Sequence, residues 1–230
     1  FKVLLSFGRA GNGQIMLDVA HQMFARGKNK LDLTALHLTV GSDVNPLHTD
    51  NFEEVSFGPI LYGAKKLGMH IHKRFKAPES WFYPGALLKD KTKMFIARSN
   101  CDVGVFINRN FVKATNTLVV ISSEEDLFLL DYTRTLLKAT HGSVGIVAKM
   151  STTTPGHDQI LKELWDFVSS TPQTQLLPDK DLTPGLFNSY NFMLIGYNTW
   201  NDVSEHRKEA LQKMPSTLIL NKNKRSSSDN

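Results

Sequence analysis

The hydrophobic and polar positions of this chain follow one order twice: an apolar run, a polar break, an amphipathic stretch and a second apolar run. The first copy spans Lys2–Leu38, and the second spans Thr117–Val147. Short apolar runs predict buried strands, and the longer amphipathic stretches predict helices. Strands that alternate with helices form βαβ units with parallel sheets. We therefore predict an α/β protein with two similar halves.

The first half is the less regular copy. Its expected strands are Lys2–Phe7, Leu33–Val40, Met69–Phe75 and Val103–Ile107, and its expected helices are Gln14–Arg26, Phe52–Leu67 and Ala86–Ser99. Gly58-Pro59 should interrupt the second of these helices. No helix and strand fit between Phe75 and Trp81, so this half is abbreviated, or a stretch near Ala77–Ser80 is missing from the sequence.

The second half contains a full set of five strands. They are expected at Leu118–Ile121, Ser143–Val147, Gln175–Leu177, Phe192–Gly196 and Ser216–Leu220, with helices at Glu124–Thr140, His157–Val168 and Asp202–Met214. Asp179–Ser189 is expected to be a loop. The predicted domains are residues 1–112 and 113–221. Residues 222–230, with Lys222, Lys224, Arg225 and a serine run, are expected to form a flexible tail.

Composition is that of a soluble globular protein, with 41% hydrophobic and 21% charged residues. No apolar run reaches the length of about 18 residues that a membrane span needs, and Lys2–Phe7 opens the chain without a secretory signal pattern. The net charge of +5 is dispersed among 22 acidic residues, so nucleic acid is not an expected partner. Cys101 is the only cysteine. This excludes an intramolecular disulfide and favours a cytosolic setting.

Two segments carry a family resemblance. In Asn100–Phe111 a cysteine leads a short apolar strand and an arginine-aromatic pair follows it, and Ser123-Glu124-Glu125-Asp126 then opens the next helix. Together with the tandem order of strands and helices, these segments resemble the universal stress protein family. They resemble more closely the tandem stress-protein-like cytosolic region that follows the membrane part of some cation/proton antiporters.

The resemblance implies a flavodoxin-like, universal-stress-protein-like sheet in each half. It also implies a non-catalytic regulatory role at the cytoplasmic face of a membrane. The partner would be the transmembrane domain of an Na⁺/H⁺ or K⁺/H⁺ antiporter in the same polypeptide, and the halves would pair as a homodimer or as an internal pseudo-dimer. Modulation of transport would then proceed through ligand binding or dimerisation.

The nucleotide-binding members of that family differ from this chain at the residues that contact the nucleotide. They carry an acid at the end of the first strand and a glycine-rich run after the fourth, so that backbone N–H groups reach phosphate oxygens. Here the second half has Ser122-Ser123 at the first position, and Gly196 is followed by Tyr197-Asn198-Thr199-Trp200. We therefore expect no nucleotide in the second half.

The candidate ligand site is the loop of the first half that joins its first strand to its first helix. It comprises Gly8, Arg9, Gly11, Asn12 and Gly13. An anion or adenine nucleotide would contact free N–H groups there, with Arg9 supplying charge. The spacing is neither the dinucleotide fingerprint nor a P-loop. The alternative is a flexible turn without a ligand.

Other candidate residues favour structural roles. His70 and His72 share one face of a predicted strand and could bind a metal or sense pH, but the exposed face of an edge strand is the favoured explanation. Glu124-Glu125-Asp126 after Ser122-Ser123 fits a capped helix start. No metal site and no catalytic residue is predicted.

Two other functions stay open at this point. One is a stand-alone tandem stress protein that binds ATP or AMP through its first half. The other is an enzyme of the adenine-nucleotide hydrolase kind, against which the absence of HxGH, SGGxDS and Gly-x-Ser-x-Gly patterns counts. We therefore predict that the chain is not an enzyme.

Overall fold

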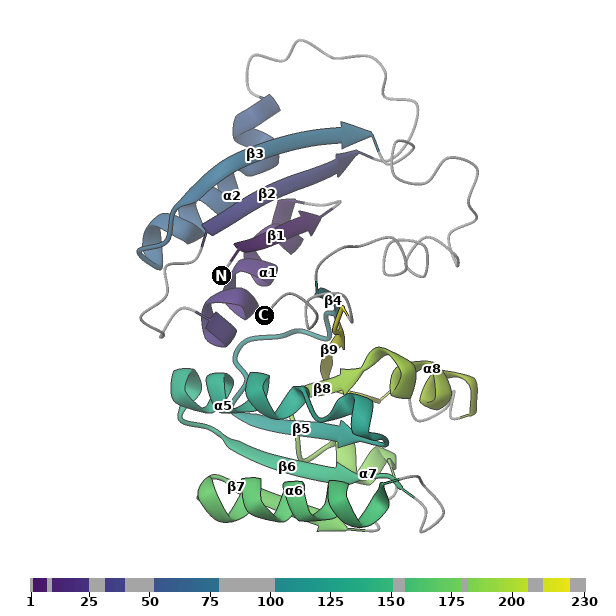
Figure 1. The fold of residues 1–230 in the computed structure, drawn as a ribbon. Coiled ribbons are helices and arrows are strands. Elements are labelled where there is room, and N and C mark those ends of the chain that lie inside the picture. The colour runs from purple at the N-terminus through teal and green to yellow at the C-terminus, as the bar shows by residue number, and fades with distance from the viewer. Residues whose placement is uncertain are drawn as a thin grey trace. The chain divides into compact units, whose positions relative to one another are not determined.

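The chain folds as two compact units, Phe1–Arg98 and Ser99–Asn230 (Figure 1). The computed structural model describes residues 2–7, 10–24, 32–39, 52–78, 102–150, 156–178, 182–206 and 213–223. Each unit holds its own sheet with parallel strands, as the sequence predicts. The helix expected at Ala86–Ser99, like Cys101, lies outside the described residues.

The first unit has a three-stranded parallel sheet in the order β1-β2-β3. Its strands are β1 (Lys2–Phe7), β2 (Asp32–Thr39) and β3 (Ile71–Pro78), and its helices are α1 (Ala10–Phe24) and α2 (Phe52–Lys66). Leu5, Leu33 and Ala35 are buried against residues of both helices. Leu4, on the other face of β1, is 50% exposed, because successive strand residues point to opposite faces.

Helix α2 runs through Gly58-Pro59 without a break, so the predicted interruption is wrong. A proline inside a helix costs about 3 kcal/mol. Phe57 and Ile60 flank the pair and are 3% and 0% exposed, and burying each such side chain contributes about 1.5–3 kcal/mol. Packing against the sheet therefore outweighs the local preference.

The second unit contains a six-stranded sheet in the order β4-β9-β8-β5-β6-β7. The strands are β4 (Val103–Ile107), β5 (Asn116–Ile121), β6 (Ser143–Ala148), β7 (Thr174–Pro178), β8 (Phe192–Gly196) and β9 (Ser216–Asn221). All neighbours are parallel except β4 and β9, which are antiparallel. The five predicted strands of this half are confirmed.

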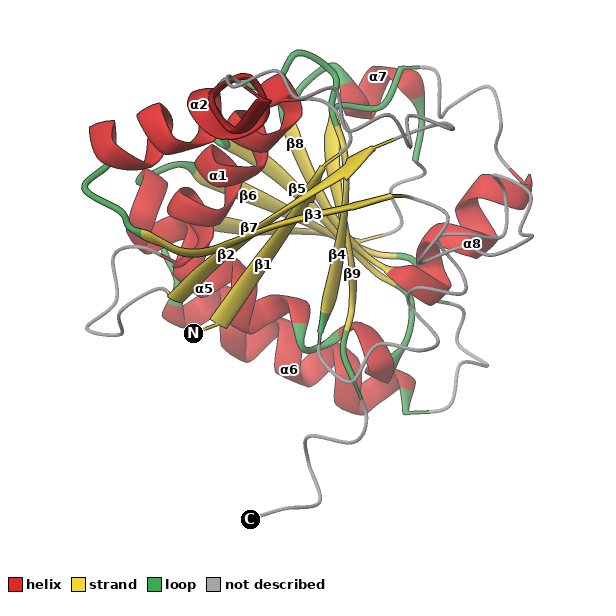
Figure 2. Ribbon diagram, turned by 90° about the horizontal axis from the view of Figure 1, so that it is seen from above, coloured by secondary structure: helices red, strands yellow, loops and turns green. Residues whose placement is uncertain are grey.

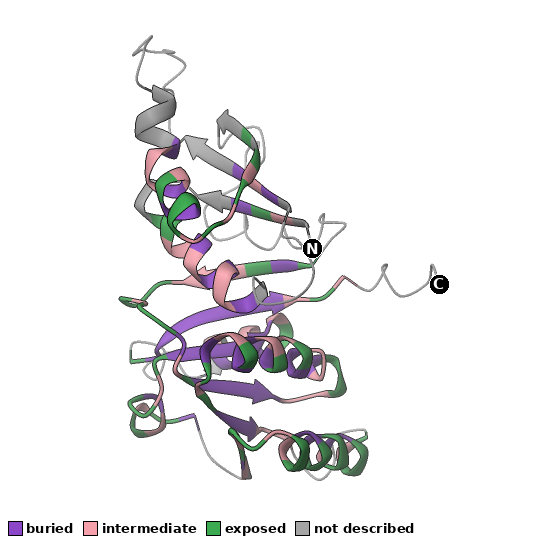
Figure 3. Cartoon of the chain, turned by 90° about the vertical axis from the view of Figure 1, so that its left-hand side faces the viewer, coloured by how far each residue is buried: buried purple, intermediate pink, exposed green. Residues whose placement is uncertain are grey.

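Helices cover both faces of the second sheet (Figure 2). They are η1 (Glu124–Asp126), α5 (Leu129–Thr140), α6 (His157–Ser170), α7 (Pro184–Phe187) and α8 (Tyr197–His206). Leu118, Val120 and Ile195 pack with Phe187 of α7 and Val203 of α8. Strands β5, β6, β8 and β9 are buried almost throughout, whereas the edge strand β4 is mostly half-buried. The outward sides of α5 and α6 are exposed (Figure 3).

Three helical features of the second unit differ from those predicted. The stretch Glu124–Thr140 divides into η1 and α5, and α7 forms inside the expected loop Asp179–Ser189. Helix α8 begins at Tyr197 rather than Asp202, directly after β8. The hydrophobic pattern does not show this start, because the only fully buried residue of the segment 197–201 is the polar Thr199.

Strand β4 belongs to the second unit, although the sequence assigned it to residues 1–112 as the last strand of the first half. Phe106, Phe111 and Phe192 form an aromatic cluster with ring centroids 5.4–6.5 Å apart. Asp102 accepts hydrogen bonds from the backbone of Asn223 at 2.8 Å and from the Tyr132 hydroxyl at 3.2 Å. The boundary between compact units therefore falls after Arg98.

The same contacts change the start of the predicted tail. Lys222 and Asn223 belong to the described structure, and the Asn223 N–H is bonded to Asp102. Residues 224–230 lie outside the described residues, so their predicted flexibility stays a prediction.

A first prediction concerns Gly142, at the turn between α5 and β6. An added Cβ would overlap the carbonyl oxygen of Thr115, which accepts the Ser143 N–H at 2.8 Å. Gly142→Ala should lower the free energy of unfolding of the second unit by about 1–3 kcal/mol, measured by urea unfolding. Gly185→Ala is the matched control, since its nearest neighbour lies at 3.9 Å. Equal stability of the two variants would contradict the packing described.

A second prediction concerns Asp18 of α1. Burial raises the pKa of its carboxyl, against the opposing charges of His21 and Lys66. The folded unit therefore holds the proton more tightly, and stability falls as pH rises from the ordinary value of 3.8 through the raised one. Asp18→Asn should stabilise α1 at pH 7 and lose this gain below pH 3.8. Amide exchange of α1 checks it, and a gain independent of pH would contradict it.

Candidate functional site

The predicted ligand loop is partly helical in the structure. Helix α1 begins at Ala10, so Gly11, Asn12 and Gly13 form its first turn rather than a loop before Gln14. Asn12 is exposed and Gly13 is buried. Gly8 and Arg9 lie outside the described residues. The three described residues thus follow the carboxyl end of β1, as the candidate site requires.

This first turn offers conditions that suit an anion. The first four N–H groups of a helix lack partners inside the helix, and the helix dipole places partial positive charge there. No acidic residue lies in the first turn of α1. Gly11 adds no side chain over these groups. The arrangement is permissive for an anion, but the described residues include no side chain that selects one.

In the second unit, the expected place for a ligand lies just beyond the carboxyl ends of the neighbouring strands β5 and β8. The connection from β5 leads to β6 on one side, and β8 pairs with β5 on the other. Ligands of such sheets bind where the strand order reverses, outside the carboxyl ends of the strands. Ser122 follows β5 at this point, and Gly196 ends β8.

The carboxylate of Asp126 occupies this position beyond the ends of β5 and β8. Its Oδ2 accepts hydrogen bonds from the Ser122 N–H at 2.9 Å, the Ser123 N–H at 3.3 Å and the Ser122 hydroxyl at 3.2 Å. The Thr199 hydroxyl donates to the same oxygen at 2.6 Å, and the Ser122 and Thr199 hydroxyls are also in contact. Asp126 is 2% exposed, so this carboxylate is buried, and its Oδ2 accepts four hydrogen bonds.

Gly196 leaves the space that Asp126 fills. A Cβ at Gly196 would overlap Oδ1 of Asp126, so the carboxylate lies directly against the backbone at the end of β8. Helix α8 begins at the next residue, Tyr197. An anion is favoured at a helix N-terminus, and the chain supplies its own anion here.

Two exposed side-chain pairs link α8 to residues at the same end of the sheet. Asn198 of α8 donates to Glu125 at 2.7 Å, and Lys149 after β6 pairs with Asp202 of α8 at 3.4 Å. These pairs are exposed and each contributes little stability. They link α8 to η1 and to the residue after β6. Together with Asp126, these side chains occupy the expected ligand position of the second unit.

The geometry confirms the helix start at Glu124-Glu125-Asp126 and identifies its acceptor. The carboxylate of Asp126 receives the backbone N–H groups, and Ser123 is the residue that precedes η1. The Asp126 carboxylate is buried, and four hydrogen bonds from neighbouring protein groups already occupy its Oδ2. The second-half motif is therefore structural.

His70 and His72 lie together at the edge of the first unit's sheet. His72 lies on the edge strand β3, His70 just precedes it, and both are exposed with ring centroids 6.0 Å apart. Across the described part of the chain, no three His, Cys, Asp or Glu side chains are placed to hold a metal ion. Nor is any helix there long and apolar enough to cross a membrane.

Sequence reasoning missed the role of Asp126. It looked for an acid at the end of the first strand and found Ser122-Ser123. The acid stands four residues later, and η1 turns it back over the strand end. The available signal was the combination of Ser122, Asp126 and the Gly196–Thr199 segment, whose small and hydroxyl side chains suit a buried carboxylate.

Comparison with known proteins supports the fold. The chain is similar in structure to a universal stress protein from Archaeoglobus fulgidus DSM 4304, with a TM-score of 0.58 and 11% sequence identity. The match covers 97% of each chain. At this identity the likeness concerns the fold alone. No family model matches the sequence, and no curated protein is similar to it in sequence.

A third prediction tests the closed edge. Asp126→Asn replaces the charged acceptor of four hydrogen bonds and should lower the stability of the second unit by about 1–3 kcal/mol. Asp158→Asn is the matched control, because the Asp158 side chain is exposed on α6. Urea unfolding followed by tryptophan fluorescence measures both variants, with Trp165 and Trp200 as reporters. A neutral effect of Asp126→Asn would refute the structural role.

Proposed function

We propose that this chain is a non-catalytic regulatory module of universal-stress-protein-like fold, in which only the first unit binds an adenine nucleotide. The observation that carries the proposal is the filled edge of the second sheet, where Asp126 stands between Ser122, Gly196 and Thr199. A phosphate would have to displace a buried carboxylate of the same charge. The second unit thus serves as a structural partner of the first.

The first unit supports ligand binding through its β1–α1 connection. Helix α1 presents a first turn with two glycines, an exposed Asn12 and no acidic side chain. Arg9 precedes this turn and supplies the positive charge that the site needs. The ligand would be held by backbone N–H groups and by these two side chains.

The proposed mechanism requires no chemical step. A nucleotide that binds one conformation of the module better than another shifts the population toward that conformation. Whatever the module contacts then responds, since the coupling between two sites is reciprocal. The change is limited by the difference in affinity between the two conformations.

A more specific role is regulation of a cation/proton antiporter. It is favoured by the resemblance of Asn100–Phe111 and Ser123–Asp126 to the tandem cytosolic region of such transporters. A stand-alone stress protein would use the same first-unit site. The coding sequence upstream of Phe1 distinguishes the two, since the transporter requires a series of hydrophobic spans.

A fourth prediction tests nucleotide binding by thermal-shift titration of the full chain with ATP and AMP. A ligand at 100 times its dissociation constant adds about 2.7 kcal/mol to the free energy of unfolding. We expect a saturable rise in melting temperature that Arg9→Ala and Gly11→Val abolish. Lys138→Ala, which removes an exposed cation of α5, should leave the rise intact.

Two results would contradict the proposal. One is the absence of a saturable shift with either nucleotide. The other is an unchanged shift in both first-unit variants, provided that their unliganded melting temperatures match that of the wild type.

A further inference from the structure

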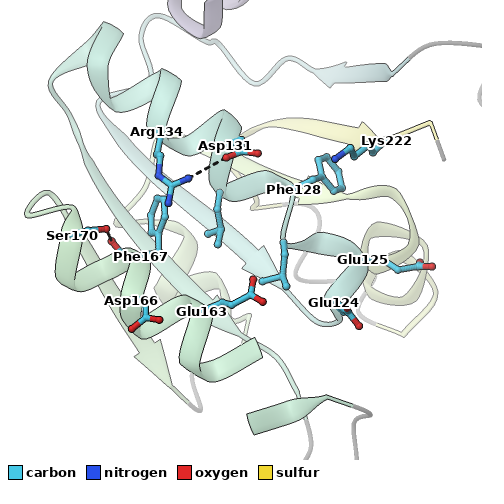
Figure 4. A pocket seen from close by; sticks show the side chains of 12 residues that line it. Glu124, Glu125, Phe128, Asp131, Arg134, Glu163, Asp166, Phe167, Ser170 and Lys222 are labelled. Atoms are coloured by element: carbon cyan, nitrogen blue, oxygen red, sulfur yellow. Dashed lines mark hydrogen bonds and ion pairs between the residues drawn. The ribbon is translucent and has the colours of Figure 1, made fainter. Parts of the chain in front are cut away.

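A second feature of the second unit is an open groove between η1, α5 and α6, with a volume of about 630 Å³ (Figure 4). It lies on the helical surface and is separate from the closed edge, because Asp126 is not among its lining residues. Lys222, just after β9, lines it from another element. Nothing in the proposed nucleotide site uses this surface.

The charge of the groove opposes that of the chain. Five carboxylates and two cationic side chains line it, a net charge of −3, whereas the whole chain carries +5. The carboxylates belong to Glu124, Glu125, Asp131, Glu163 and Asp166. They come from three elements and surround the groove, so a single small cation cannot meet them all.

One of the two cations is already engaged. The Arg134 guanidinium pairs with Asp131 at 3.1 Å and lies 4.9 Å from the ring centroid of Phe167 (Figure 4). This contact fixes the wall between α5 and α6 and offsets the charge of Asp131. Of the other carboxylates, Glu125 accepts a hydrogen bond from Asn198 and Glu163 accepts one from Gln159. Lys222 is the other positive charge of the lining.

The groove also offers apolar contact. Leu127 and Phe128 are partly exposed, and Leu130 and Phe167 lie beneath as buried side chains. The Phe128 ring is fixed edge-on to Tyr132, with ring centroids 6.0 Å apart. Apolar surface surrounded by carboxylates matches an amphipathic segment whose polar face carries lysine or arginine.

We propose that this groove binds a basic amphipathic helix of a partner protein. Apolar residues at positions i, i+3, i+4 and i+7 would contact Leu127 and Phe128, which is the usual mode of helix recognition in a groove. Lysines on either side would face the carboxylates of η1 and α6. Charge complementarity would speed association and make it dependent on salt. An anionic ligand would be repelled.

The test uses the full chain and a fluorescent 16-residue peptide of leucine and lysine with that apolar spacing. A peptide in which glutamate replaces lysine is the control probe. Binding is measured by anisotropy at about 50 and 300 mM salt. We expect saturable binding of the basic peptide alone, weakened at the higher salt.

The variants locate the binding surface. Glu163→Gln combined with Asp166→Asn should weaken binding about three- to tenfold, because each exposed charge pair is worth about 0.2–1 kcal/mol. Asp158→Asn, on the same helix α6 but outside the groove, should not change it. Unchanged affinity in the double variant, or an equal loss in the control, would overturn the proposal.

Two other occupants would also be recognised. A chain that ends at Asn223 and binds the peptide at least tenfold more tightly would assign the groove to residues 224–230 and overturn the assignment to a partner. A dimer at micromolar concentration that Glu163→Gln with Asp166→Asn dissociates would assign it to a second copy of the chain. A failure of the nucleotide experiment affects none of these readouts.

Discussion

A buried carboxylate organises the second unit. Asp126 lies where the strand order of the sheet reverses, and its Oδ2 accepts hydrogen bonds from Ser122 and Ser123, between β5 and η1, and from Thr199 of α8. Removing a carboxylate from water costs several kcal/mol unless hydrogen bonds replace the lost solvation. The donors must therefore stay in place together, and Gly196 must lack a side chain. The edge that usually accepts a ligand in such folds has become an internal joint between three elements.

Other contacts of the second unit also connect its elements to one another. Strand β4 extends the sheet by antiparallel pairing with β9, and Asp102 fixes both Asn223 and Tyr132. The Phe106, Phe111 and Phe192 cluster closes the same side. What this unit presents outward is the acidic groove over α5 and α6. The proposed binding of a basic helix therefore uses the helical surface of this unit and not its sheet edge.

The sequence predicted all nine described strands and the α/β class, because strand cores such as Val119–Ile121 and Met193–Ile195 are apolar without interruption. It failed where tertiary contacts override local preference. Pro59 stays inside α2 because Phe57 and Ile60 are buried, and α1 starts at Ala10 despite two glycines. The role of Asp126 depends on Thr199, which is 73 residues away, and no local pattern encodes that pairing. The placement of β4 depends likewise on Phe192 and Ser216.

The most direct test of the closed second unit is to map AMP binding by amide chemical shifts in the isotope-labelled full chain. The account predicts that shift changes are confined to the start of α1 and that Ser122, Ser123 and Gly196 do not move at saturation. Saturable changes at these three amides would mean that the nucleotide enters the second sheet edge. That result would contradict the assignment of Asp126 as the permanent occupant of this position.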